Sequence, residues 1–152
     1  MIPFPEKRAF CDTSFFFAAL YPRDVNYDRA GEILRDALQQ EIDLFTTWDI
    51  LSETVTLLLY RFNSKAAIRF LDELKPGLAI VAYDDSVREE AEKVFRILIR
   101  DKKVSFCDAI SFVVARTILK DVACLSFDDD FSRLGLTVIM TDSRWGRTKT
   151  SF

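Results

Sequence analysis

Acidic residues stand alone in stretches of the chain that are otherwise apolar. Asp12 is the only charged residue between Arg8 and Arg23, and Asp108 is the only one between positions 103 and 116. Burying an ionised carboxylate costs several kcal/mol unless the group is paired or binds a metal ion. Each of these acids therefore predicts an ion pair, a helix cap or a metal site.

A third stretch, from Trp48 to Tyr60, contains Asp49 and Glu53 as its only charged residues. Because they are four positions apart, both lie on one face of a helix and compete for one role. We interpret Asp49, in the expected first turn, as a partner of the helix dipole, and Glu53 as the functional acid. A shared cluster of oxygen ligands would explain Asp12, Glu53 and Asp108 together.

A fourth group of polar residues, Ser126-Phe-Asp128-Asp129-Asp130, directly follows an apolar segment. Asp128 can cap a short helix, and the dipole of that helix favours acids in its first turn. The alternative is that Asp128 supplies a fourth ligand, with Asp130 beside it. The sequence leaves open which of these two is the ligand.

The residue types that are absent narrow the chemistry. The chain has no histidine, which excludes histidine-dependent catalytic triads and histidine zinc sites. Its three cysteines, Cys11, Cys107 and Cys124, contain no CxxC spacing, so they predict neither a disulfide framework nor a zinc knuckle. We interpret them as buried free thiols in a reducing compartment.

Carboxylates without histidine or cysteine ligands favour hard cations, Mg²⁺ or Mn²⁺. Such ions orient a phosphate, activate a water and stabilise the leaving oxygen in phosphodiester chemistry. They also explain how a chain with a net charge of −3 can hold a polyanion. The acids therefore point to a metal-dependent phosphodiesterase.

Short apolar segments alternate with helical patterns along the chain. Strands are expected at 8–12, 42–46, 78–82, 122–127 and 137–141, and helices at 15–21, 24–40, 48–62, 63–74, 85–100, 105–119 and 128–134. This alternation predicts an α/β protein with three α/β/α layers around a five-stranded parallel sheet. The strand at 78–82 and the helix at 105–119 are expected to be buried on all sides. Reactive groups gather at the carboxyl ends of such strands, where Asp12 lies.

The 152 residues predict one domain, 1–152, with a core at about 8–142 and a basic tail at 143–152. The apolar run near the N-terminus is short and interrupted by Asp12, so it does not resemble a signal peptide. No segment is long enough to span a membrane. We therefore expect a cytoplasmic protein without membrane partners.

Four motifs in this order resemble the PIN-domain family and, within it, the VapC-type ribonuclease toxins of prokaryotic toxin–antitoxin pairs. The motifs are Phe-Cys-Asp12-Thr-Ser, Ser52-Glu53-Thr-Val-Thr-Leu-Leu, Phe106-Cys107-Asp108-Ala-Ile and Ser126-Phe-Asp128-Asp-Asp130-Phe131, the last followed by Gly135. Each motif is weak alone, but their order, spacing and places on the expected elements make the set specific. The resemblance covers about residues 8–142.

The resemblance implies the strand order 3-2-1-4-5 and an endoribonuclease that depends on Mg²⁺ or Mn²⁺. Asp12, Glu53, Asp108 and Asp128 would be the catalytic and metal-binding acids, with Asp130 as a variable metal-binding neighbour. Ser126 matches a hydroxyl position of the family. The family also implies a homodimer and an antitoxin whose C-terminal segment lies across the site.

Contacts with the RNA substrate would come from groups around the acids. The candidates are Ser126 and the positive residues Lys103 and Arg144, and Trp145 could stack on a base. The alternatives to contact with RNA are that Lys103 belongs to a solvated loop and that Arg144 belongs to a tail that is flexible or packs on a dimer partner.

Two other kinds of protein compete with the nuclease. A catalytically silent PIN-like module would act through protein contacts and would lack metal affinity. Phosphotransfer on an aspartate is disfavoured, because Asp12 lacks the second acid that such sites place beside the first strand. Separately, the run Phe15 to Phe17 predicts an oligomer contact, since three consecutive aromatic residues are not expected to face one core.

Overall fold

A parallel sheet lies at the centre of the protein, as the alternating pattern predicts. The structure is a computed structural model that describes residues 1–101 and 103–139. Within these residues the strands are β1 (Arg8–Cys11), β2 (Asp43–Thr46), β3 (Leu78–Ile80), β4 (Cys124–Leu125) and β5 (Val138–Ile139). Every pairing is parallel and the order is β3-β2-β1-β4-β5. The predicted fold class and strand order are confirmed.

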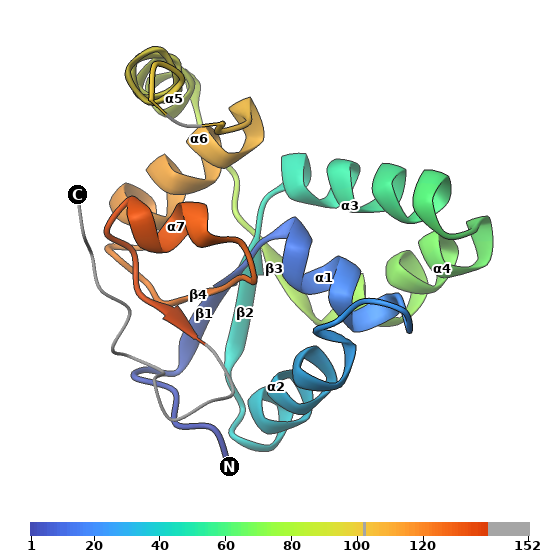
Figure 1. The fold of residues 1–152 in the computed structure, drawn as a ribbon. Helices are drawn as coiled ribbons and strands as arrows, with labels where there is room; N and C mark the ends of the chain where they lie inside the picture. The colour runs from blue at the N-terminus through green and yellow to red at the C-terminus, as the bar shows by residue number, and fades with distance from the viewer. Residues whose placement is uncertain (102, 140–152) are drawn as a thin grey trace.

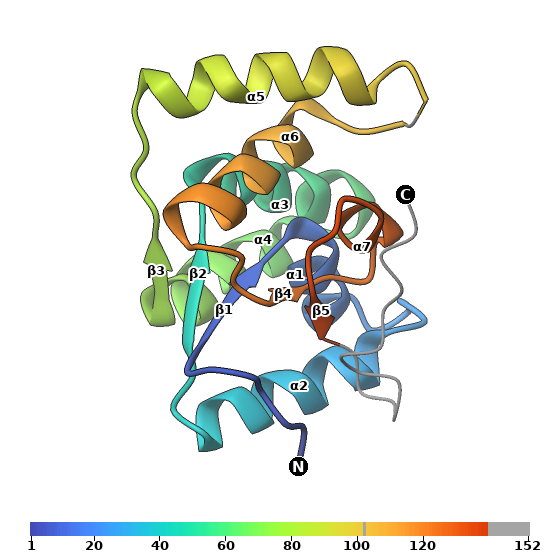
Figure 2. The ribbon, with the colours of Figure 1, turned by 90° about the vertical axis from the view of Figure 1, so that its left-hand side faces the viewer.

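Helices cover both faces of the sheet. They are α1 (Thr13–Leu20), α2 (Tyr27–Gln39), α3 (Trp48–Arg61), α4 (Ser64–Arg69), the π-helical η1 (Phe70–Leu74), the 3₁₀ turn η2 (Lys75–Gly77), α5 (Asp85–Leu98), α6 (Phe106–Val113), the π-helical η3 (Val114–Ile118) and α7 (Asp129–Arg133). Figure 1 shows α1 to α4 on one side of the sheet and α6 and α7 on the other. Helix α5 lies away from the sheet, over α6 (Figure 2).

Local side-chain caps set most of the helix starts. Thr47, Asn63 and Ser105 each accept a hydrogen bond from a backbone N–H of the helix that follows. Helix α2 begins later than expected, because the Asp24 carboxylate accepts from the N–H of Asn26 and holds a turn there. The cap of α5 is Asp84, one residue before the predicted Asp85.

The phenylalanine run in α1 is buried inside the molecule, so the oligomer contact predicted from it is wrong. Phe15, Phe16 and Phe17 are all buried. Helix α1 packs against both α2 and α3, and the ring of Phe16 lies 5.1 Å from that of Phe70 in η1. Because α1 is a central helix, its neighbours cover aromatic residues on several faces at once.

Two elements are less buried than their apolar sequences predict. Strand β3 is at the edge of the sheet, and its Ala79 and Ile80 are exposed. The helical segment 106–118 is buried in its middle, but Phe106 and Ile118 are exposed at its ends. An apolar run does not reveal whether its strand is central or at an edge. Among the described residues, no helix has the length and apolar character needed to cross a membrane.

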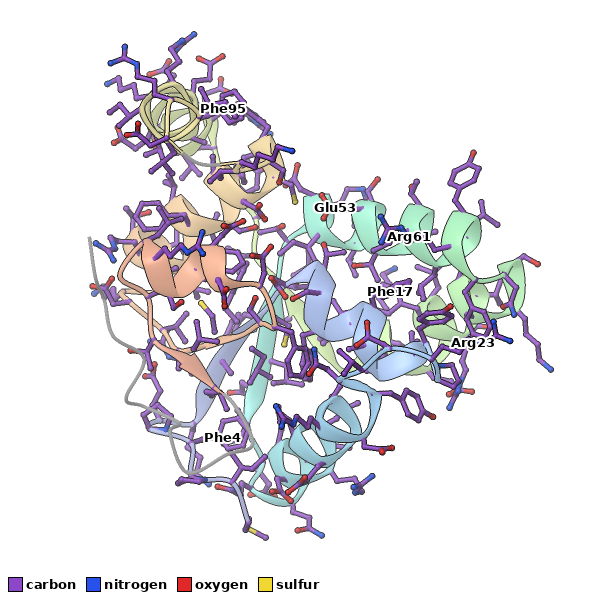
Figure 3. The ribbon with its side chains drawn as sticks, viewed as in Figure 1. Phe4, Phe17, Arg23, Glu53, Arg61 and Phe95 are labelled. Carbon is purple, nitrogen blue, oxygen red and sulfur yellow. The ribbon has the colours of Figure 1, made fainter. Side chains whose placement is uncertain are left out.

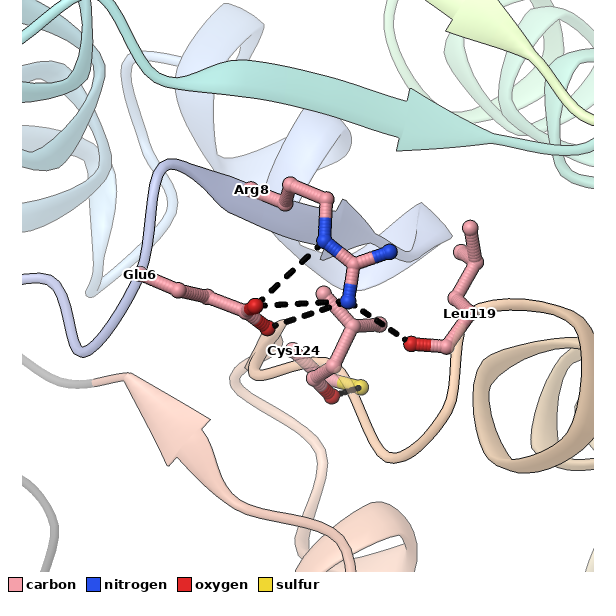
Figure 4. A network of polar contacts seen from close by, with 5 residues as sticks. Glu6, Arg8, Leu119 and Cys124 are labelled. Carbon is pink, nitrogen blue, oxygen red and sulfur yellow. Dashed lines mark hydrogen bonds and ion pairs between the residues drawn. The ribbon is translucent and has the colours of Figure 1, made fainter.

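An arginine connects the amino end of β1 to the segment that leads into the neighbouring strand β4. The Arg8 Nη2 atom donates to the carbonyl of Leu119 at 3.0 Å and pairs with Glu6 at 3.3 Å (Figure 4). Leu119 follows η3 and leads into β4, so this contact helps to align β1 with β4. Asp12 follows β1, and Ser126 follows β4 on the same edge.

Candidate active site

Asp12 is the most buried acid of the site, and hydroxyl and amide donors hold its carboxylate. It caps α1 directly after β1 and is 5% exposed. Its Oδ1 accepts from Ser14 Oγ at 2.8 Å and from the N–H of Phe15 at 3.1 Å, while Oδ2 accepts from Ser126 Oγ at 2.7 Å. The position at the carboxyl end of the first strand is the predicted one.

The environment of Asp12 opposes its ionisation. Burial raises the pKa of this carboxyl to about 7, against the three hydrogen bonds, which lower it. The nearby Asp108 carboxylate also raises the pKa. A cation bound beside Asp12 would favour the ionised form.

Three further carboxylates converge next to Asp12. One oxygen from each of Asp108, Asp128 and Asp130 lies within 4.8 Å of the other two. Asp108 belongs to a capping box at the start of α6, in which its Oδ2 accepts from the N–H of Ser105 at 3.2 Å. Asp128 caps α7, and its Oδ1 accepts from the N–H of Asp130 at 3.0 Å. Helix caps thus fix where these acids lie.

The crowded carboxylates shift one another's ionisation. Burial raises the pKa of Asp108, and the Asp128 and Glu53 carboxylates raise it further. Burial and the Asp128 carboxylate raise the pKa of Asp130 to about 6. A set of acids that resists losing all its protons is what a divalent cation would stabilise.

The structure separates the two acids of α3. The Tyr83 hydroxyl donates to Asp49 Oδ2, so that carboxylate is engaged with the segment between β3 and α5. Glu53 is exposed on the same helix (Figure 3), and its carboxylate raises the pKa of Asp108 and of the Cys107 thiol. Glu53 is therefore the acid of α3 whose charge acts on Asp108, and its functional role stays a prediction.

The expectation that every lone acid is buried is correct for Asp12 only. Asp108 is partly exposed and Glu53 is exposed. Glu53 lines a groove of about 600 Å³ between α3 and α6 that is open to solvent, and Asp108 follows the lining residue Cys107 in the chain. The exposed first turn of α6 accounts for the difference at Asp108, because the sequence predicted full burial of that helix.

Ser126 lies inside the site rather than at its rim. It is 2% exposed, and its hydroxyl is used by Asp12, so the geometry favours a positioning role over contact with a substrate. Lys103 is exposed in the segment before α6. Arg144, Trp145 and the rest of the basic tail lie outside the described residues.

Sequence reasoning missed three residues near the acids. Ser14 donates to Asp12 and accepts from the N–H of Phe127 at 2.9 Å, which links α1 to the segment after β4. The sequence contained a signal for Ser14, because this serine stands two positions from a candidate acid, Asp12, just as Ser126 stands two positions from Asp128. The contact of Tyr83 with Asp49 had no such signal, and neither had the placement of Cys107 and Glu53 in one groove.

The residues present fit a hard divalent cation. The converging atoms are carboxylate oxygens, the preferred ligands of Mg²⁺ and Mn²⁺. None of the ion pairs within the described part of the chain includes Asp12, Asp108, Asp128 or Asp130. Among residues 1–101 and 103–139, therefore, no ion pair explains this cluster.

Comparison with known proteins gives consistent matches. Residues 9–136 match the family model described as PIN domain. A curated relative from Archaeoglobus fulgidus, described as a VapC ribonuclease, is 35% identical over 127 residues, which cover 82% of this chain and 79% of the relative.

Solved structures with a similar fold agree. The crystal structure of Mycobacterium tuberculosis VapC20, described as a sarcin-ricin loop cleaving toxin, is similar with a TM-score of 0.72 and 26% identity, covering 87% of this chain and 98% of that one. FitAcB from Neisseria gonorrhoeae has a TM-score of 0.62 at 15% identity, with 86% and 95% covered, and this likeness concerns the fold alone.

Proposed function

Because the chain belongs to the PIN-domain family, we propose that it is an endoribonuclease of the VapC type and the toxin of a toxin–antitoxin pair. Two relatives, one described as a VapC ribonuclease and one as a sarcin-ricin loop cleaving toxin, support this proposal. The observation that carries it is the convergence of Asp108, Asp128 and Asp130 beside the buried Asp12.

The reaction proposed is hydrolysis of an RNA phosphodiester bond with Mg²⁺ or Mn²⁺. Asp12, Asp108 and Asp128 would hold the ion, with Asp130 and Glu53 as neighbouring oxygen donors. A bound divalent ion neutralises charge on the phosphate and activates the attacking water. Ser14 and Ser126 orient both oxygens of Asp12, so the carboxylate need not reorganise when the ion and the substrate bind.

The partners of the protein follow from the same proposal. Its substrate is RNA, with Lys103 and Arg144 as candidate phosphate contacts, and its inhibitor is an antitoxin protein. We also propose that the chain is a single domain that forms a homodimer and acts in the cytoplasm, where its RNA substrate lies. These points rest on the family.

The test is cleavage of an end-labelled RNA by the purified protein with Mg²⁺ or Mn²⁺, beside an EDTA control. The variant Asp108→Asn removes one acid of the cluster. Asp129→Asn is its matched control, because Asp129 is an exposed acid next to the cluster that pairs with Arg133 at 3.9 Å. We expect metal-dependent cleavage by the wild type and Asp129→Asn, and at least a 100-fold loss in Asp108→Asn.

The alternative is a catalytically silent PIN-like module that acts through protein contacts. Neither cleavage nor binding of Mn²⁺ by the wild type would favour that module. Equal cleavage by all three proteins would instead indicate a contaminating nuclease.

A further inference from the structure

The groove between α3 and α6 exposes aromatic side chains directly beside the acid cluster. Trp48, the first residue of α3, is 63% exposed, and Phe106, the first residue of α6, is 44% exposed. Both line the groove of about 600 Å³, together with Glu53 and Cys107. Glu53 acts electrostatically on Asp108, and Cys107 is the neighbour of Asp108 in the chain, so this part of the groove lies near the acids. Its volume is within the range of about 300–1,000 Å³ of small-molecule sites.

The charges of the groove select what part of a nucleic acid can enter it. Asp49 and Glu53 are the acids among its lining residues, and their carboxylates repel a phosphate. A nucleobase carries no charge and has a flat apolar face. The groove therefore suits a base, while the phosphate attached to that base remains at the acid cluster. Arg61, at another part of the lining, is available to a further phosphate of the strand.

The two aromatic rings are held in place from outside the groove. The ammonium group of Lys75 lies 5.4 Å from the centroid of the Trp48 ring, a cation–π contact that orients the indole. The Phe106 ring meets Phe95 of α5 edge to face, with the centroids 5.4 Å apart. Rings that are already oriented lose little entropy when a base stacks on them.

We propose that Trp48 and Phe106 form a subsite for one unpaired RNA base next to the phosphodiester that is cleaved. The proposal rests on the proposed ribonuclease function and assigns two residues that contact the base. A base must leave its helical stack to lie on these rings, so binding here requires an unpaired nucleotide.

Tryptophan fluorescence tests the subsite directly. The chain has two tryptophans, so Trp145→Phe leaves Trp48 as the only one. Asp108→Asn in the same protein keeps the RNA uncut. We expect a single-stranded oligoribonucleotide to quench this signal at concentrations where the same strand, hybridised to its complement, does not. Equal quenching by both forms, or by neither, would overturn the subsite.

Kinetics on the otherwise unchanged protein give the second test. Base–aromatic stacking strengths predict that Trp48→Ala lowers kcat/KM for a single-stranded RNA by about 5- to 150-fold, mainly through KM. Trp48→Phe retains most of the activity, because a ring remains. Ile97→Ala is the control, since Ile97 is equally exposed but lies on α5 outside the groove.

The outcomes separate this proposal from the function on which it rests. A wild type that cleaves RNA while Trp48→Ala and Ile97→Ala behave alike refutes the subsite and leaves the nuclease intact. A wild type that cleaves no RNA refutes the nuclease, and the quenching experiment still reports on the groove. A Trp48→Ala protein with unchanged RNA kinetics but weakened binding of a co-expressed antitoxin would make the groove a protein-docking surface and overturn the proposal.

Discussion

Ionisation of Asp12 should destabilise the metal-free protein as the pH rises. Burial raises the pKa of this carboxyl from 3.8 to about 7 in the folded state, although Ser126 and Ser14 donate to it. Between these two values the folded protein keeps a proton that the unfolded chain has released. The free energy of unfolding therefore falls as the pH increases across this window and levels off above it. Below pH 3.8 the contribution of the Asp12 carboxyl to the free energy of unfolding is fully present.

The size of the effect follows from the two pKa values. One pH unit corresponds to about 1.4 kcal/mol, so a rise from 3.8 to about 7 sets an upper limit of about 4 kcal/mol. Asp12→Asn removes the titrating group and keeps its shape. Asp108 and Asp130 have raised pKa values for a similar reason, so the variant should keep a smaller slope of the same sign.

Urea unfolding measured by circular dichroism at a series of pH values in EDTA would test this. The wild type should lose stability between about pH 4 and 7, and Asp12→Asn should lose clearly less. Asp129→Asn, which removes an exposed acid, should follow the wild type. An identical decline in the wild type and Asp12→Asn would refute the reasoning that Asp12 is held in an environment hostile to its charge.

Three other outcomes are expected. Phe16→Ala, at a fully buried site in α1, should lower the free energy of unfolding by about 3–5 kcal/mol in urea titrations, whereas Ile97→Ala should change it by less than about 0.5 kcal/mol. Mg²⁺ or Mn²⁺ at 100 times the wild-type dissociation constant should raise that free energy by about 2.7 kcal/mol, and the gain in Asp108→Asn at the same metal concentration should be clearly smaller. Ser126→Ala removes a donor that lowers the pKa of Asp12, so the acidic limb of the pH–rate profile should move to higher pH; an unmoved limb would contradict that role.

The architecture could be predicted because its signals are local. Alternating apolar strands and amphipathic helices specify a parallel sheet, and side chains such as Thr47 and Ser105 cap their own helices. Burial was harder to predict, since it depends on neighbours far along the chain. The run from Phe15 is buried because α2 and α3 both cover α1, and Ile80 is exposed because no strand lies beyond β3 in the described sheet.

The candidate acids could be found for a related reason. A lone charge such as Asp12 in an apolar stretch is costly, and that cost is visible in the sequence. Contacts between distant segments leave no comparable trace. The Tyr83 hydroxyl that engages Asp49 comes from 34 positions away, and nothing in either stretch indicates the pairing. The resemblance to a family supplied the strand order, which periodicity alone does not determine.

Titration of Mn²⁺ into the wild type, Asp108→Asn and Asp129→Asn, followed by calorimetry, tests the central claim most directly. The claim is that the converging carboxylates form one site for a divalent cation. Binding by the wild type and Asp129→Asn, with at least a tenfold weaker affinity in Asp108→Asn, is the expected result. Equal affinity in all three proteins, or no binding by the wild type, would contradict it.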